Sequence, residues 1–258
     1  MKTLYAALVA GALAAAAHSA SASIVITEVD PFGSNGSDGY SADWFELTNT
    51  GTSAASIAGW TMIDNHASSG SSISVGNTTK PAAGLTLANG QTTLGAGQSA
   101  VFLESPNSGA GSSALIAQFE QAWFGAKAPA GLLVGTYNDT SSANFGLSQS
   151  GDMVNIFDGS TSSATLEASV TFGTDAGSPI GTFENAAGLN NVTLTQQSVA
   201  GVNGAFVSAS GLEIGSPGTI SAVPLPDSVV LLLSGLGALG LVVIGRRSVP
   251  SAAGSLAA

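Results

Sequence analysis

Four carboxylates near the start of the chain, Glu28, Asp43, Glu46 and Asp64, stand close to runs of β-branched and aromatic residues. Hard cations such as Ca²⁺ are bound by several carboxylate and carbonyl oxygens, so these side chains could form a calcium site. The chain has no Asp-x-Asp-x-Asp-Gly run of the kind that makes a calcium-binding loop. We therefore expect turn and surface roles for these carboxylates and no bound cofactor. A calcium-dependent binding module is an alternative.

Nucleophilic and imidazole chemistry have little support in the sequence. The chain contains no cysteine, which excludes thiol catalysis, disulfides and cysteine-ligated metal sites. Beyond the leading segment His66 is the only histidine, whereas imidazole metal sites use more than one. No Gly-x-Ser-x-Gly elbow occurs between a predicted strand and a helix. We expect His66 to be an exposed loop residue and the protein not to be an enzyme. A secreted hydrolase of matrix polymers using paired carboxylates is the alternative.

The charge balance argues against a nucleic-acid partner. Five Lys and Arg residues stand against 16 Asp and Glu, giving a formal net charge of −11 over 258 residues. Proteins that bind a phosphate backbone neutralise it with Lys and Arg, which are scarce here. Charged residues make up only 8% of the chain and glycine occurs 34 times, which favours a turn-rich β-protein.

Short runs of β-branched and aromatic residues, separated by turn residues, predict one all-β domain with a sandwich or barrel fold. The predicted strands are 24–29, 44–49, 57–63, 86–87, 99–104, 131–137, 153–157, 166–172 and 192–195. Leu115, Phe119 and Trp123 repeat every four residues behind Ser112, a possible N-cap. This spacing predicts one short helix that ends at Gly125.

The first 22 residues have the pattern of a secretory signal peptide. One Lys precedes a short apolar run, and small residues follow it. The best cleavage site has Ala20 and Ala22 in an Ala-x-Ala arrangement, with cleavage before Ser23. We therefore expect export of the chain, with a signal helix at its N-terminus that is removed.

The C-terminal region contains an uninterrupted apolar stretch, 229–245, followed by Arg246 and Arg247. At about 1.5 Å per residue this stretch would be roughly 25 Å long, at the short end for a bilayer core. The Arg pair places the following residues in the cytoplasm by the positive-inside rule. We expect a single-pass transmembrane helix over 229–245, in the inner membrane during transit, and a cytoplasmic tail over 248–258.

The segment 222–247 contains a Pro-x-Pro motif, which is followed by the apolar stretch 229–245 and then by the Arg pair. The motif consists of Val223, Pro224, Leu225 and Pro226. This order resembles the PEP-CTERM sorting signal of Gram-negative bacteria, in its VPLPA variant, with Asp227 in place of the usual Ala. The resemblance implies an exosortase-type processing enzyme as a partner, cleavage near Pro226, and delivery to the cell surface or an exopolysaccharide matrix. An ordinary single-pass anchor is the alternative interpretation.

Motifs along the body, 23–221, resemble those of the lamin-tail domain. They are 24–29, 43–51, 57–64, 94–103, 146–158 and the closing Gly215-Ser216-Pro217-Gly218. The resemblance implies an immunoglobulin-like β-sandwich that acts as a non-catalytic module of secreted or surface proteins. The insertions 30–42 and 65–83 depart from the family pattern. In such a sandwich Trp44 and Trp60 are expected to fill the core between the sheets. Taken together, these features predict a non-catalytic surface or extracellular-matrix protein with a structural or adhesive role.

Overall fold

β-Strands and one helix make up the described part of the computed structural model, residues 23–33, 39–64, 82–105, 112–138, 146–174, 180–185 and 193–219. All of these residues belong to one unit, Ala20–Val223. Within them no helix is both long and apolar enough to cross a bilayer. Several sequence predictions lie outside the described residues: the signal segment 1–22 with Ala20 and Ala22, His66, the motif Val223–Pro226, the helix 229–245, Arg246 and Arg247, and the tail 248–258.

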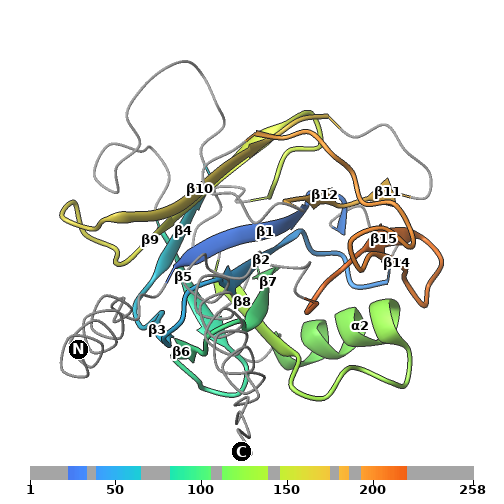
Figure 1. Ribbon diagram of the computed structural model, residues 1–258, viewed down its shortest axis with the longest axis horizontal. Coiled ribbons are helices and arrows are strands. Elements are labelled where there is room, and N and C mark those ends of the chain that lie inside the picture. The colour runs from blue at the N-terminus through green and yellow to red at the C-terminus, as the bar shows by residue number, and fades with distance from the viewer. Residues whose placement is uncertain are drawn as a thin grey trace, which may run out of the picture. The chain divides into compact units, whose positions relative to one another are not determined.

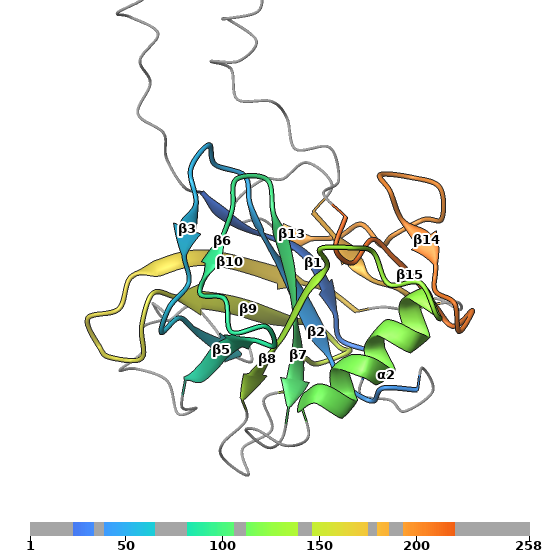
Figure 2. The same cartoon turned by 90° about the horizontal axis from the view of Figure 1, so that it is seen from below.

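Ten strands form the main sheet, most of them antiparallel to their neighbours (Figures 1 and 2). In spatial order they are β12 (Phe183–Glu184), β1 (Ile24–Asp30), β2 (Trp44–Asn49), β7 (Ser99–Ser105), β8 (Leu133–Asn138), β5 (Ala83–Leu87), β4 (Thr61–Asp64), β9 (Asp152–Phe157), β10 (Leu166–Phe172) and β13 (Thr193–Leu194). The pairs β7–β8 and β10–β13 are parallel.

Strand β5 connects two halves of this sheet. Its residues 85–87 pair with β8, whereas Ala83 and Gly84 pair with β4. The half that contains β9 and β10 folds across the half that contains β1 and β2, and β1 contacts β10 (Figure 1). The mostly β-strand fold with one short helix agrees with the sequence prediction.

Two smaller sheets complete the described strands. One consists of β11 (Ile180–Gly181), β15 (Glu213–Gly215) and β14 (Phe206–Val207), and the other of β3 (Ala55–Ser56) and β6 (Thr93–Leu94). The predicted strand 57–63 begins only at Thr61, because Gly59 has a φ of +75° and turns the chain first. Strands of two or three residues leave too little pattern to be predicted from sequence.

The first hydrophobic core lies between the two halves of the sheet. Phe45 and Phe102 stack there with ring centroids 5.6 Å apart, and Tyr137 lies 5.3 Å from Phe45. Trp60 belongs to this core and is 8% exposed. The expected position of Trp60 between the halves is therefore confirmed.

Helix α2 (Ser112–Phe124) covers the opposite face of the strands β2, β7 and β8 and forms a second core with them (Figure 2). The helix follows the predicted pattern, and Gly125, with a φ of +63°, ends it. Trp44 is completely buried, but it lies in this second core beneath α2 and not between the halves. The reason is strand alternation: Phe45 faces the first core, so its neighbour Trp44 faces the helix.

Candidate functional site

Glu28 and Glu46 face each other across the pair β1–β2, where they are register partners. The register shifts between Ile26 and Glu28, which is a β-bulge in β1. Ile26 and Val29 both lie in the first core, and Glu28, between them, is turned to the opposite face of the sheet. Each glutamate is 1% exposed. The bulge therefore creates a buried carboxylate pair on the face of the sheet that the C-terminal segment covers.

The pair accepts hydrogen bonds from Ser216 and Gly218 of that segment and from the hydroxyls of Thr27 and Thr182. Glu28 accepts hydrogen bonds from the Ser216 backbone N–H at 2.8 Å, from the Ser216 hydroxyl at 3.2 Å, and from the Thr182 hydroxyl. Glu46 accepts from the Gly218 N–H at 2.6 Å and from the Thr27 hydroxyl at 2.6 Å. The turn 216–218 thus donates one backbone N–H to each member of the pair.

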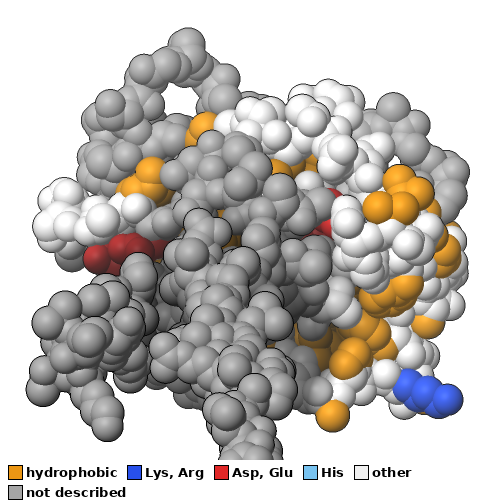
Figure 3. All heavy atoms as spheres, in the orientation of Figure 1, with side chains coloured by type: hydrophobic (Ala, Val, Ile, Leu, Met, Phe, Trp, Pro, Cys, Tyr) orange, Lys and Arg blue, Asp and Glu red, His pale blue; other side chains and the backbone are white. Residues whose placement is uncertain are grey.

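Burial alters the protonation of both glutamates, and at Glu28 the charge of Glu46 adds to the effect. Burial raises the pKa of Glu46 from 4.5 to about 7. The pKa of Glu28 is raised well above its ordinary value, mainly by burial and secondly by the negative charge of Glu46. Among the described residues Lys127 is the only basic side chain, and it is exposed. The described residues that are visible in Figure 3 are mostly hydrophobic or uncharged. Below pH 7 the pair therefore retains a proton that exposed glutamates would have lost.

A second acidic group surrounds the buried hydroxyl of Tyr137 and consists of Asp43, Asp64, Glu104 and Asp152. Burial, followed by the charges of these carboxylates, raises the pKa of Tyr137 well above its ordinary value. Asp43 accepts a hydrogen bond from the Leu147 N–H at 2.7 Å, and Asp152 accepts one from the Ser148 N–H at 3.0 Å. These carboxylates fix the segment that leads into β9.

The expectation of turn and surface roles for Glu28, Asp43, Glu46 and Asp64 is wrong as regards the surface, because all four are at most 1% exposed. The structure also separates them: Glu28 and Glu46 form one group, whereas Asp43 and Asp64 belong to the group around Tyr137. In the part of the chain that is described, no three Asp, Glu, His or Cys side chains are arranged to hold a metal ion.

Tyr40 connects the insertion 30–42 to the rest of the site. Its buried hydroxyl donates to Glu213 at 2.8 Å and accepts from the indole N–H groups of Trp44 at 3.0 Å and Trp123 at 3.3 Å. Sequence reasoning missed this residue because it lies in a Gly- and Ser-rich stretch that looks like an unstructured loop. Its only sequence signal is an aromatic side chain among small polar ones.

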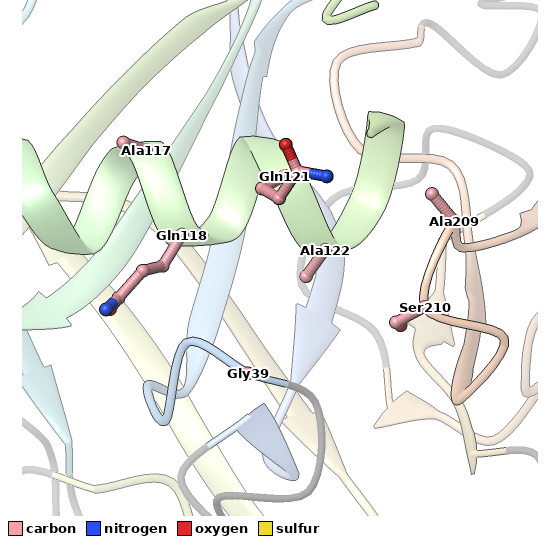
Figure 4. A pocket seen from close by; sticks show the side chains of 7 residues that line it. All are labelled: Gly39, Ala117, Gln118, Gln121, Ala122, Ala209 and Ser210. Carbon is pink, nitrogen blue, oxygen red and sulfur yellow. The ribbon is translucent and has the colours of Figure 1, made fainter. Parts of the chain in front are cut away.

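An open hollow of about 520 Å³ lies beside α2 (Figure 4). It is lined by Gly39, Ala117, Gln118, Gln121, Ala122, Ala209 and Ser210. None of these side chains is acidic, so the hollow does not offer the facing carboxylates that a glycosidase needs. The pair that does face each other, Glu28 and Glu46, is buried beneath the turn 216–218.

The described residues form a mostly β-strand module, and the carboxylates of its opening motif are buried in the interior. A family model described as Lamin Tail Domain matches residues 17–174, more than half of the chain. The chain therefore belongs to the lamin-tail domain family, as its sequence motifs indicated. The match ends before the turn 216–218, which the structure joins to the opening motif. No curated protein and no solved structure matches the chain.

Proposed function

We propose that this chain is a non-catalytic exported protein of the cell surface or extracellular matrix, with a structural or adhesive role. The lamin-tail domain is an immunoglobulin-like module, which is compatible with such a role. The N-terminal signal peptide would direct export, and an exosortase-type enzyme would process the C-terminal tail. The alternatives in another class, a hydrolase or a calcium-dependent module, find no specific support in the described residues.

One observation carries the non-catalytic part of the proposal. All four candidate carboxylates are buried, and three of them, Glu28, Asp43 and Glu46, accept hydrogen bonds from backbone N–H groups. A carboxylate that acts on a polymer has to reach the scissile bond. Glu28 and Glu46 instead hold the C-terminal turn against the sheet, so their role is to stabilise the fold.

The sequence of the tail supports the sorting part of the proposal. The last described residue, Thr219, is followed closely by Val223-Pro224-Leu225-Pro226. Prolines fix φ and keep the preceding residue extended, which suits recognition by a protease. The apolar stretch and the Arg pair would hold the chain in the inner membrane until it is cut. The partners would then be the processing enzyme and an exopolysaccharide or surface matrix, with no nucleic acid.

Replacing Arg246 and Arg247 by alanine should redirect the protein in its native host. Removing both charges takes away the cytoplasmic stop that orients the helix, so we expect loss of correctly processed protein from the cell surface. Cell fractionation followed by immunoblotting measures this. The matched control replaces both residues by lysine, which keeps the positive charge and should keep the wild-type location. Unchanged location in the alanine variant would contradict the assignment of the Arg pair.

A further inference from the structure

We propose that the Glu28–Glu46 pair is a proton-operated clasp, which holds the turn 216–218 while the pair retains a proton and loosens the turn when that proton leaves. The C-terminal end of the described domain would then respond to external pH. This inference goes beyond the proposed function and stands independently of the tail's being a sorting signal.

The geometry of the pair provides the clasp. One carboxylate binds the Ser216 N–H and the other binds the Gly218 N–H, so both ends of a three-residue turn depend on the pair. Gly215 fits the same place closely, because a Cβ there would lie 2.5 Å from a Glu28 oxygen and 2.8 Å from the Trp123 ring. The turn is thus seated directly on the carboxylates.

Neutral hydroxyls that can reorient form hydrogen-bonded chains on both sides of the pair. Thr27, Thr48 and Ser99 form a chain from Glu46, with hydroxyl distances of 2.9 Å and 2.6 Å. On the other side the Thr182 hydroxyl lies between Glu28 and the Ser198 hydroxyl, 2.8 Å from the latter. A hydroxyl can donate or accept, so this network accommodates a protonated or an ionised carboxylate.

Within the described ranges no positively charged side chain lies beside the pair, since the one basic residue there, Lys127, is exposed. The ionisable groups that neighbouring elements bring towards it are acidic: Glu184 on β12, opposite Glu28, Asp30 on β1 and Glu213 on β15. Helix α2 contributes the Trp123 ring, and β7 contributes the Ser99 hydroxyl. A second negative charge would therefore lie buried beside the first with no counterion from the part of the chain that is described, which is unfavourable.

The sign of the pH effect follows from the direction of the pKa shifts. Both glutamates have a folded-state pKa above the ordinary 4.5, that of Glu46 being about 7, so the folded protein binds more protons than the unfolded chain between these values. The stability from the pair is therefore fully present below about pH 4.5 and is lost as the pH rises through about 7. The N–H bonds from Ser216 and Gly218 favour the ionised carboxylates, but burial has the larger effect on both pKa values. Opening of the turn would let water reach the pair and remove the cost of burial, so the turn should loosen over the same pH range.

Amide hydrogen exchange of the purified full chain in detergent, at pH 5.5 and pH 8, tests the clasp. After correction for intrinsic exchange, protection of the Ser216 and Gly218 amides should fall tenfold or more between pH 5.5 and pH 8, because each pH unit below the pKa of Glu46 of about 7 contributes about a factor of ten. Protection of β7 and β8 provides the internal reference. In the Glu46→Gln variant, which cannot ionise, the fall should be much smaller.

Two further variants make the result decisive. Glu120→Gln on α2 removes a carboxylate away from the pair and should keep the full wild-type pH response. Glu28→Gln removes the other member of the pair and replaces Glu46→Gln if that variant does not fold. Equal protection of the turn at both pH values in the wild-type protein would overturn the proposal. So would a tenfold fall that persists in the glutamine variant of either pair member.

Discussion

Replacing Trp44 by alanine should lower the free energy of unfolding by about 3–5 kcal/mol, as expected for a large aromatic side chain removed from a core. Trp44 is completely buried and makes edge contacts with Phe119 and Trp123, at centroid distances of 5.9 Å and 5.7 Å. The change also removes an N–H that donates to the Tyr40 hydroxyl. Chemical denaturation followed by tryptophan-independent circular dichroism measures the loss.

A matched control for this prediction is Val199→Ala, which shortens an apolar side chain that is 59% exposed. Its effect should stay within about 0.5 kcal/mol, as is usual for surface substitutions. A loss of less than about 1 kcal/mol for Trp44→Ala would contradict the second core beneath α2, because such a value is typical of a side chain that packs against little.

Gly135→Ala should also be strongly destabilising, by about 1–3 kcal/mol or more, because it overpacks the interior of the main sheet. Gly135 lies on β8 between β7 and β5. A Cβ at this position would lie 2.3 Å from the Thr86 carbonyl oxygen and 3.0 Å from the Leu87 Cα. These are backbone atoms, so relief requires a shift of the strand itself.

Gly84→Ala is the comparison that isolates steric crowding from the general effect of replacing glycine. Gly84 lies on the neighbouring strand β5, and a Cβ there would meet nothing within 4 Å. Its stability should be unchanged or slightly raised, since alanine reduces the entropy of the unfolded chain. Thermal unfolding of the two variants side by side measures the difference. Equal melting temperatures of the two variants would contradict the close packing of Gly135 against the backbone of β5.

Local sequence patterns were sufficient for the elements that have a clear period. The helix was predicted because Leu115, Phe119 and Trp123 share one face. A strand was predicted over 99–104 because its apolar run follows a glycine turn, and the structure has it over Ser99–Ser105. The side of the sheet that Trp44 occupies could not be predicted in this way. A strand that is buried on both faces gives no alternation to show which face meets the helix.

The carboxylate pair shows a second limit of sequence reasoning. Glu28 and Glu46 are polar residues in otherwise apolar strands, which suggests exposure when only the sequence is considered. Their burial depends on a bulge in β1 and on donors about 170 to 190 positions later in the chain. The closing motif Gly215–Gly218 was recognised from the family resemblance, but its function as a hydrogen-bond donor becomes visible only in the folded chain.

Mass spectrometry of the protein recovered from the native cell surface and medium tests the central claim most directly. The account predicts a mature form that begins at Ser23 and ends close to Pro226, without the segment that follows. Peptides that run intact from Val223 through Arg246 in the dominant form would contradict it and would make the C-terminal segment a permanent membrane anchor.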